Sequence, residues 1–364
     1  MHIAFYAPLK SPNHPVPSGD RQMARLLMAA MQQAGHTVEI ASQLRSFTST
    51  PEAGARQQVA LQAENEAKRL ATKWRQGAKP DLWFCYHPYY KAPDLIGPKL
   101  ASLFNLPYVT AEASYSRRRD ETGWAELQLL VSDAVRQAVV NICFTKRDEA
   151  GLAAAVPAVH LARLAPFIDV LPFAREPSVQ GAHRLVTVAM MRPGDKLESY
   201  SMLAAALALI EDLPWTLTVI GDGPARDAVR ALFAKFSAGR IGWLGEKPAT
   251  EVVHLLYEGG TYVWPGTGEA YGIAYMEAQA AGLPVVAQKT AGVPEVVKDG
   301  VTGTLTPAGD TLAFAHAIAH MLGDGGRRNK MGWAARRFIL QDRSLDVASR
   351  RLDELLRDFT GAGL

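Results

Sequence analysis

Two glutamates, Glu269 and Glu277, stand eight residues apart in residues 266–284, which read G-T-G-E-A-Y-G-I-A-Y-M-E-A-Q-A-A-G-L-P. This stretch holds no arginine or lysine that could pair with either acid. On a helix the spacing separates two side chains by about 12 Å along the axis, comparable with the span from the sugar to the ribose of a nucleotide sugar. Each acid could therefore accept hydrogen bonds from ligand hydroxyls. Alternatively, Glu269 favours a helix dipole and Glu277 is exposed to solvent.

The backbone between the two acids is a candidate phosphate site. Ala270, Tyr271 and Gly272 lie where the helix is expected to start. Free N–H groups and the helix dipole attract anions at such a position. We therefore expect the N–H groups of these three residues to face the phosphates of a bound nucleotide.

A second candidate phosphate site is R-P-G-D-K-L at residues 192–197, directly after a strand candidate. Arg192 offers a planar fork and Lys196 a mobile point charge, and both would lie at the carboxyl end of the strand. The pair could converge on a diphosphate. The alternative is a salt bridge between Lys196 and Asp195 or Glu198.

The loop over residues 8–20, P-L-K-S-P-N-H-P-V-P-S-G-D, is long for a strand-to-helix connection. Gly19 would let a ligand approach the backbone at the start of the next helix, where an anion is favoured. A proline-rich loop that ends with Ser18 as the helix cap is the alternative. The motif G-x-G-x-x-G follows the first strand of neither half, which disfavours a dinucleotide-dependent dehydrogenase.

Two further clusters are candidates for binding an acceptor. His87 ends a strand within C-Y-H-P-Y-Y, where its ring and the tyrosines could stack on a ligand and form hydrogen bonds to it. Arg117, Arg118 and Arg119 could meet an anionic acceptor, a phosphate or a membrane headgroup. A packed loop around His87 and a solvated loop around the arginines are the alternatives.

The elements that position these residues alternate between short apolar strands and longer amphipathic helices, a pattern that predicts parallel sheets covered by helices. In the first half, a periodic helix runs from Ser18 to Gly35 and a polar one covers 56–76. The strand candidates there are 2–7, 36–41, 81–86, 107–111 and 139–145. The same alternation restarts after residue 182 with strand candidates 185–191, 215–220, 240–244, 260–264, 283–287 and 301–305, and with late helices near 310–322, 327–340 and 345–359.

The fold class predicted is α/β, with two tandem Rossmann-like, doubly wound domains. The first would span residues 1–168, a proline-containing linker 169–182, and the second domain 183–344. We expect the C-terminal helix within 345–364 to pack back on the first domain. Ligands of such sheets bind beyond the carboxyl ends of the strands, so the loops of the two domains would face a common cleft.

The composition sets further bounds. A chain of 364 residues is long enough for two cores, and a net charge of +3 is far below that of a typical nucleic-acid binder. We predict no nucleic-acid partner, whereas contact with a membrane surface is compatible with the charge. Cys85 and Cys143 lie in apolar runs and are expected to be buried.

The sequence shows no cysteine or histidine cluster with metal-ligand spacing, so no metal is expected. It also shows no signal peptide and no membrane span, and we expect a cytoplasmic protein, compatible with a peripheral location at the inner membrane face. The sequence indicates no oligomeric state.

Taken together, these residues resemble glycosyltransferase family 4, whose members are retaining enzymes of the GT-B fold. The resemblance rests on the two-glutamate stretch and the following A-G-V-P-E-V-V-K-D-G-V-T-G, on R-P-G-D-K and on V-I-G-D-G-P. It extends to P-S-G-D and G-H-T-V near the N-terminus. It covers nearly the whole second domain and a smaller share of the first.

The resemblance implies a role for each matching residue. Glu269 would accept hydroxyls of the donor sugar, Glu277 would hold the ribose, and Arg192 with Lys196 would bind the diphosphate and stabilise it as the sugar departs. The other implied donor-binding residues are Gly19, Asp20 and Gly221, with Trp243 and Leu244 near the base. The resemblance also implies a nucleotide diphosphate sugar as the donor. The family needs no metal, so no cofactor is expected.

Three positions depart from the family pattern. Ala270 stands where a second glycine is common, and Gly19-Asp20 stands where a pair of glycines is common. After the fourth strand, Glu112 and Ala113 occupy the place of a histidine that contacts the donor sugar. Either Glu112 has a catalytic or acceptor-binding role of its own, or that contact is lost.

The sequence therefore predicts an enzyme that transfers a hexose, with retention, from a nucleotide diphosphate sugar to a hydroxyl of a lipid, polysaccharide or small molecule. Two alternatives stay open at this point. One is a GT-B sugar-nucleotide epimerase or phosphorylase, and the other is a non-catalytic nucleotide-sugar-binding protein. The base, the sugar and the acceptor are not indicated.

Overall fold

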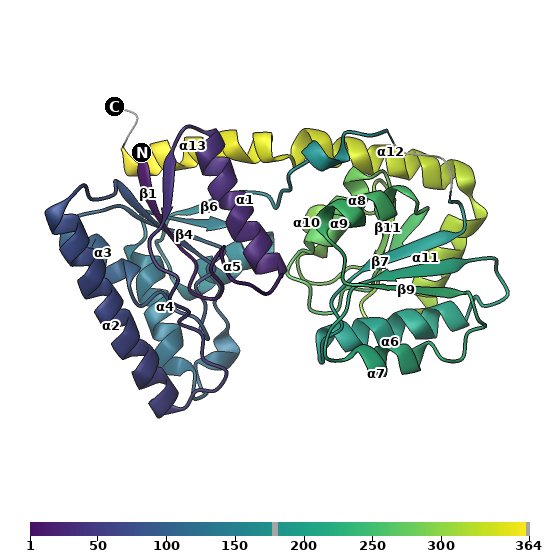
Figure 1. Cartoon of the computed structure of the whole chain (residues 1–364), viewed down its shortest axis with the longest axis horizontal. Coiled ribbons are helices and arrows are strands. Elements are labelled where there is room, and N and C mark those ends of the chain that lie inside the picture. Colours follow the sequence, from purple (N-terminus) through teal and green to yellow (C-terminus); the bar gives the residue numbers. More distant parts are fainter. Residues whose placement is uncertain (177–180, 362–364) are drawn as a thin grey trace. The chain divides into compact units, whose positions relative to one another are not determined.

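The protein, described here from a computed structural model that covers residues 1–176 and 181–361, forms two compact units. The first comprises Met1–Ala165 together with the C-terminal segment from Leu345, and the second comprises Pro166–Ser344. Each unit holds one six-stranded parallel sheet with helices around it (Figure 1). The predicted fold class, two tandem doubly wound α/β domains, is confirmed.

The first unit orders its strands β2-β1-β3-β4-β5-β6, and every pairing is parallel. The five strands predicted from apolar runs are all present, and a sixth, β6, was missed because three residues carry too little pattern. The strands are β1 (His2–Tyr6), β2 (Thr37–Ile40), β3 (Leu82–Tyr86), β4 (Tyr108–Ala111), β5 (Val140–Cys143) and β6 (Leu161–Arg163). The helices are α1 (Gly19–Gln33), α2 (Ala53–Gln76), α3 (Gly97–Phe104), α4 (Ala125–Gln137) and α5 (Lys146–Ala155), with a short 3₁₀ turn η1 (Arg117–Arg119).

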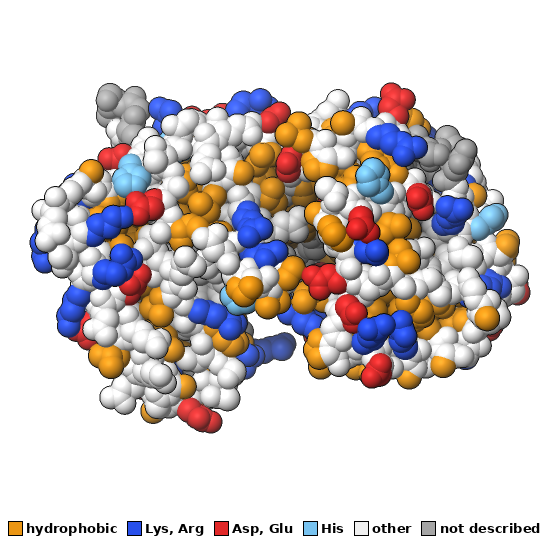
Figure 2. All heavy atoms as spheres, in the orientation of Figure 1, with side chains coloured by type: hydrophobic (Ala, Val, Ile, Leu, Met, Phe, Trp, Pro, Cys, Tyr) orange, Lys and Arg blue, Asp and Glu red, His pale blue; other side chains and the backbone are white. Residues whose placement is uncertain are grey.

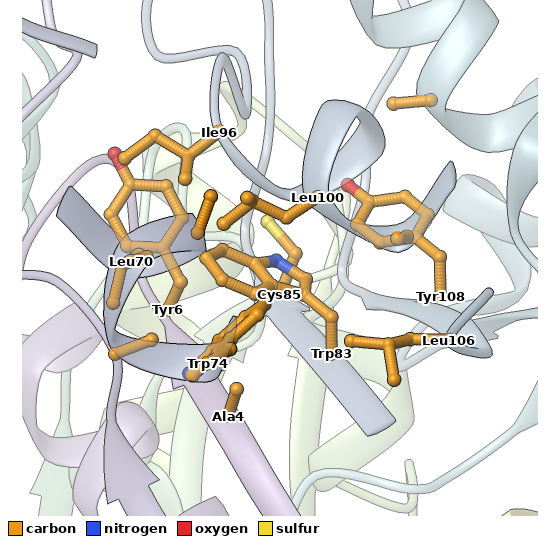
Figure 3. Packing of buried hydrophobic residues seen from close by; sticks show 14 of the residues in the cluster. Ala4, Tyr6, Leu70, Trp74, Trp83, Cys85, Ile96, Leu100, Leu106 and Tyr108 are labelled. Carbon is orange, nitrogen blue, oxygen red and sulfur yellow. The ribbon is translucent and has the colours of Figure 1, made fainter. Parts of the chain in front are cut away.

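The core of the first unit is built around β3, whose five residues are all buried. Figure 3 shows Trp83 and Cys85 of this strand among residues of β1, α2 and α3. The Trp83 indole N–H donates to the buried carboxylate of Asp94, with Nε1 and Oδ2 2.9 Å apart, so the large ring is placed without an unsatisfied polar atom. Phe84 points to the opposite face and stacks on Phe5 at 5.7 Å. Cys85 and Cys143 are buried and unpaired, as predicted.

The second unit orders its strands β12-β11-β10-β7-β8-β9, again all parallel. Each of its strands coincides with a predicted one to within a few residues. The strands are β7 (Arg184–Val188), β8 (Thr216–Ile220), β9 (Ile241–Gly245), β10 (Thr261–Val263), β11 (Val285–Gln288) and β12 (Gly303–Thr306). The helices are α6 (Asp195–Ala208), α7 (Arg226–Leu232), α8 (Ala249–Tyr257), α9 (Ile273–Ala280), α10 (Val293–Val296), α11 (Thr311–Gly323) and α12 (Gly325–Asp342), preceded by the 3₁₀ turn η2 (Leu171–Phe173).

The order of the strands sets where a ligand can bind in each unit. The strand order reverses between β1 and β3 in the first unit, and between β7 and β10 in the second, because the strands that follow β1 or β7 are first added on one side and then on the other. The helices that follow the two strands of each pair leave toward opposite faces, which opens a crevice at the carboxyl ends of those strands. The loops after β1, β3, β7 and β10 are therefore the positions at which functional residues are expected.

The last helix, α13 (Leu345–Thr360), packs on α1 within the first unit. The Ser349 hydroxyl donates to the backbone oxygen of Ala30 at 2.8 Å, and the ring of the buried His36 lies 3.0 Å from the Asp353 carboxylate. The predicted linker 169–182 contains η2, and its residues 177–180 lie outside the described residues, as do 362–364 of the predicted last segment.

No helix in the described part of the chain is both long and apolar enough to cross a bilayer. On the face drawn in Figure 2, basic and acidic side chains are interspersed. This distribution agrees with the small net charge of +3.

A pair of glycine substitutions tests the packing around Trp83. A Cβ atom on Gly97 would lie 2.2 Å from Trp83 Nε1 and 2.3 Å from Asp94 Oδ2, so Gly97→Ala forces two hydrogen-bonded, buried groups apart. We expect Gly97→Ala to lower the free energy of unfolding by about 1–3 kcal/mol in urea denaturation. Gly151 lies within α5, where a Cβ atom would meet no other atom within 4 Å, so Gly151→Ala should instead leave the stability unchanged or raise it by up to about 1 kcal/mol. Equal midpoints for the two variants would contradict the packing described here.

Candidate active site

Two loops of the second unit meet at the point where the strand order of its sheet reverses. Arg192 and Lys196 follow β7, and Glu269 follows β10, the strand that pairs with β7. Lys196 lies in the first turn of α6, whereas Glu269 lies in the connection between β10 and α9. The sheet thus brings together the residues of the two candidate phosphate and sugar motifs.

Glu269 is not an unpaired acid. The ammonium of Lys196 donates to Glu269 Oε1, and the indole N–H of Trp264 donates to the same oxygen, with Nε1 and Oε1 3.1 Å apart. The side chains of Glu269 and Lys196 are 17% and 21% exposed, so the pair is reachable from solvent. The expectation that Glu269 lacks a basic partner is wrong, because the partner comes from 73 residues earlier in the chain. The alternative pairing of Lys196 with Asp195 or Glu198 is not the one observed.

Trp264 contacts both members of the Glu269–Lys196 pair, and it is not among the site residues predicted from the sequence. Its ring lies edge-on to Tyr200 at 4.8 Å, and Lys196 Nζ stands 5.4 Å from the ring centroid, close enough for a cation–π contact. Its backbone oxygen accepts from the Tyr275 hydroxyl at 3.1 Å. A tryptophan as the first residue after a buried strand, directly before P-G-T-G, is the signal that could have identified it.

The loop that carries Glu269 packs tightly against the start of α6. Thr267 N–H donates to the Ser199 hydroxyl oxygen at 3.0 Å. Gly268 has φ +68°, and a Cβ atom there would lie 2.0 Å from Asp195 Oδ2. Only glycine fits this position, since both the backbone angle and the space exclude a side chain. The loop therefore fixes the Glu269 carboxylate relative to the helix that carries Lys196.

The second glutamate lies where predicted, but the geometry between the two acids differs. Glu277 is a half-buried residue of α9, which begins only at Ile273 after Gly272 as its N-cap. Three of the seven residues between the acids are thus not helical, so the estimate of about 12 Å for a continuous helix does not apply. Ala270 is exposed, whereas Tyr271 is buried.

The remaining predicted donor-side residues differ in their surroundings. Arg192 is exposed, and among the described residues its side chain has no hydrogen-bond or ion-pair partner, so it is available to an anion. Gly221 has φ +142°, and a Cβ atom there would lie 2.0 Å from the backbone oxygen of Ala189. Glycine is needed at position 221 because the backbone segments directly after β7 and β8 approach so closely.

Trp243 and Leu244, the predicted base-side residues, lie in β9. The Trp243 ring packs edge-on against Phe233 at 5.5 Å and under the Arg230 guanidinium at 5.6 Å. Leu244 is 37% exposed. Leu244 therefore offers an open apolar surface, whereas Trp243 is engaged within the unit.

The first unit carries a second cluster of charged residues, near the point where the strand order of its own sheet reverses. Asp20 lies in the first turn of α1, which follows β1, and His87 follows β3 directly. His87 Nδ1 and Asp20 Oδ1 are 3.1 Å apart. Glu112 follows β4, the next strand, and is buried with its Oε2 atom lacking any hydrogen-bond partner in the described part of the chain.

His87 and Glu112 both have left-handed backbone conformations, with φ +58° and +56°. Such angles cost on the order of 1–3 kcal/mol for a residue other than glycine and are found mainly at functional sites. Both residues also keep their strand hydrogen bonds, since His87 N–H donates to Ala111 and Glu112 N–H to Ile142, each at 2.8 Å. The left-handed conformations occur directly after β3 and β4, so they change the direction of both side chains at the end of the sheet.

The charges of this cluster are interdependent. Burial opposes the charged form of His87, but the hydrogen bond to Asp20 and the nearby Glu112 outweigh it and raise the pKa of His87 to about 9. Burial raises the pKa of Glu112 to about 7, in spite of the opposing effect of His87. The contact with His87 lowers the pKa of Asp20 against the effect of its own burial. His87 is therefore an imidazolium at neutral pH.

The other first-unit candidates have simple environments. Ser18 caps α1 by accepting from Arg21 N–H at 3.2 Å, which confirms the alternative interpretation of that loop end, and Gly19 is the first residue of the helix. Arg117 and Arg118 are exposed in η1, without a side-chain partner among the described residues. Arg119 instead lies over the Tyr90 ring, at 4.8 Å.

Comparison with known proteins identifies the second unit. Residues 182–324 match the family model described as glycosyl transferases group 1. A GDP-mannose-dependent alpha-(1-6)-phosphatidylinositol monomannoside mannosyltransferase of Mycolicibacterium smegmatis is 30% identical over 217 residues, 55% of this chain and 57% of that protein. A D-inositol 3-phosphate glycosyltransferase of Corynebacterium diphtheriae is 38% identical over 98 residues, 27% of this chain and 23% of that protein. The chain thus spans little more than half of one of these relatives and about a quarter of the other.

Solved structures match over the whole chain. Sucrose-phosphate synthase from Thermosynechococcus elongatus has a TM-score of 0.77 at 18% identity and covers 100% of both chains. Anabaena Alr3699/HepE in complex with UDP-glucose has a TM-score of 0.72 at 15% identity and covers 98% of this chain and 100% of the other. The fold is that of the GT-B glycosyltransferases. The match to the glycosyl transferases group 1 model lies within the second unit.

The charge of His87 can be measured directly. In an NMR titration we expect the ring of His87, assigned by its loss in His87→Gln, to titrate near pH 9. Glu112→Gln and Asp20→Asn should each move that titration toward the ordinary value near 6.5, because each removes a negative neighbour. The raised pKa adds stability that is complete below about pH 6.5 and is lost as the pH rises through about 9. The fall in unfolding free energy over that window should flatten in His87→Gln.

Glu121→Gln is the matched control for this titration, since Glu121 is an exposed acid of the same unit. It should leave the His87 titration unchanged. A wild-type His87 that titrates near 6.5, or an equal shift in Glu121→Gln and Glu112→Gln, would contradict the cluster as described.

Proposed function

We propose that the protein is a retaining glycosyltransferase that moves a hexose from a nucleotide diphosphate sugar to a hydroxyl acceptor. The observation that carries the proposal is the Glu269–Lys196 pair at the carboxyl ends of β7 and β10. Both residues lie within the segment that matches glycosyl transferases group 1. Ligands of doubly wound sheets bind where the strand order reverses, as it does between these two strands.

In this proposal Lys196 is shared between the acid and the substrate. Without donor, Lys196 neutralises Glu269. When the diphosphate arrives, Lys196 turns toward it together with the exposed Arg192, and two cations then face two negative charges. Glu269 is released to accept hydrogen bonds from the sugar hydroxyls, while Trp264 N–H keeps its carboxylate in position.

The reaction breaks the bond between the anomeric carbon and the diphosphate oxygen and forms a bond from that carbon to the acceptor oxygen. The electron pair of the broken bond leaves with the nucleoside diphosphate, and the acceptor hydroxyl passes its proton to the departing diphosphate oxygen. Arg192 and Lys196 stabilise the charge that grows on the leaving group. We assign the leaving-group role to these cations rather than to a metal, and Glu277 to the ribose hydroxyls. Chelation with EDTA should leave turnover unchanged.

We assign acceptor binding to the first unit, at Asp20, His87 and Glu112. A hydroxyl both donates and accepts, and this cluster offers an imidazolium donor beside a carboxylate oxygen that has no partner in the described residues. The names of two relatives support a hydroxyl acceptor, because a phosphatidylinositol monomannoside and an inositol phosphate both carry hydroxyls. Glu112 would then take part in acceptor binding in its own right.

The donor base can be identified by ligand stabilisation. One relative is named for GDP-mannose, and one neighbouring structure contains UDP-glucose. A bound donor raises the melting temperature by mass action, so UDP-, GDP- and ADP-sugars can be compared on the unmodified chain. The sugar nucleotide that gives the largest rise is the donor to use in the assays that follow.

Substitution of the Glu269–Lys196 pair tests the proposal. We expect Glu269→Gln and Lys196→Ala each to lower turnover by about a hundredfold or more, measured as nucleoside diphosphate release with the donor identified above. Glu269→Gln keeps the shape of the side chain and removes its charge. Lys196→Ala removes an interaction with the leaving group.

Glu251→Gln is the matched control, because Glu251 pairs with Lys247 on the surface of the same unit. It should retain wild-type turnover. Wild-type rates in folded Glu269→Gln and Lys196→Ala proteins would remove the site assignment. Product formed from the donor alone, without acceptor or water consumed, would instead indicate an epimerase.

A further inference from the structure

One face of α12 carries a basic groove that the proposed function does not use. The groove has a volume of about 770 Å³ and is lined by Arg327, Lys330, Trp333 and Arg337 of α12 and by Val301 of the turn before β12. Met331 forms part of its floor and is buried. None of its lining residues belongs to the Glu269–Lys196 cluster.

The cations of α12 fall into two groups. Arg328 and Arg336 are buried and donate to backbone oxygens, Arg328 to Met321 at 2.8 Å and Arg336 to Phe173 at 2.9 Å, so they are part of the structure of the unit. Arg327, Lys330 and Arg337 are exposed on the other side of the helix. None of these three forms an ion pair with a described residue.

The acids near this face are engaged elsewhere. Asp342, near the end of α12, lies 3.5 Å from Lys298. Asp324 caps the helix by accepting from Arg327 N–H, and Asp299 accepts from Leu305 N–H at 2.9 Å. The three outward cations therefore form a positive face whose charges have no ion-pair partner among the described residues.

The apolar side chains in the groove are exposed to an unusual degree. Trp333 is 50% exposed and Val301 is 52% exposed. All seven tryptophans of the chain lie in the described part, and the other six are buried or half-buried. An exposed tryptophan among unpaired cations is the composition of surfaces that bind the interfacial region of a membrane, where the ring contacts acyl chains and the cations contact phosphates.

We propose that this face of α12 binds the surface of an anionic phospholipid bilayer. The three cations are spread over ten residues, about 15 Å along the helix, which is more than one phosphate can contact. A surface with many phosphates fits that spread better than a small soluble anion does. Trp333 and Val301 then enter the headgroup region beside the cations. The inference is independent of the chemistry at Glu269.

Vesicle sedimentation tests the proposal on the full chain. Phosphatidylcholine vesicles with a third of the lipid replaced by phosphatidylglycerol should bind the protein, whereas pure phosphatidylcholine vesicles should bind it much less. Added salt should weaken the binding, because screening acts on exposed charges. The triple variant Arg327→Ser, Lys330→Ser, Arg337→Ser should bind about a hundredfold more weakly, from about fivefold for each cation removed.

The matched control removes the same charge from the first unit. Arg75→Ser, Lys99→Ser, Arg147→Ser removes three exposed cations, again two arginines and one lysine, so it has the same net charge as the α12 triple variant and leaves the groove intact. It should bind the anionic vesicles as the wild type does. Equal losses in the two triple variants would overturn the proposal, because they would show an effect of net charge alone.

Tryptophan fluorescence supplies a readout at the groove itself. Anionic vesicles should shift the emission to shorter wavelength, and the shift should vanish in Trp333→Phe, since the remaining tryptophans are already shielded. Soluble glycerol phosphate should produce no such shift. A shift that persists in Trp333→Phe, or an equal shift with glycerol phosphate, would overturn the membrane assignment, the latter in favour of a soluble anion site.

Discussion

The ion pair between Lys196 and Glu269 is the interaction on which the proposed donor site depends. It exists because β7 and β10 are neighbours in the sheet, so that the loops after them meet at one edge. The packing around it serves the same geometry: Gly268 has room for no side chain beside Asp195, and Trp264 donates its indole N–H to the same carboxylate oxygen. About one-fifth of each side chain is exposed, so a more highly charged ligand can reach the pair and compete with Glu269 for Lys196.

The first unit also carries charged side chains at the carboxyl ends of its strands, but the groups differ from those of the second unit. Its cluster also lies where the strand order reverses, but it combines one imidazolium with two carboxyl groups. Two of these residues, His87 and Glu112, have left-handed backbone conformations. The strain at His87 and Glu112 is tolerated because both keep their hydrogen bonds to neighbouring strands. The two units therefore present opposite chemistry at equivalent positions of similar sheets. A lysine–glutamate pair lies there in the second unit, and an imidazolium with two carboxyl groups lies there in the first.

Much of the fold could be predicted from the sequence, because buried parallel strands read as short apolar runs and the helices between them are periodic. L-W-F-C-Y and the six strands of the second unit are examples, whereas L-A-R of β6 was too short to recognise. The order of strands within a sheet has no local signal. For that reason the pairing of Glu269 with Lys196 was missed, although both residues were candidates. The same limit applies to Asp20, whose contact with His87 depends on β1 and β3 being neighbours in the sheet.

The most direct test of the account is the affinity of the free nucleoside diphosphate for the Glu269→Gln variant, measured by calorimetry beside the wild type. If Lys196 must leave Glu269 to reach the diphosphate, removal of the negative charge frees the lysine beforehand. The account then predicts tighter binding of the nucleoside diphosphate by Glu269→Gln, even as its turnover falls. Equal or weaker binding by a folded Glu269→Gln protein would contradict a lysine shared between the acid and the substrate.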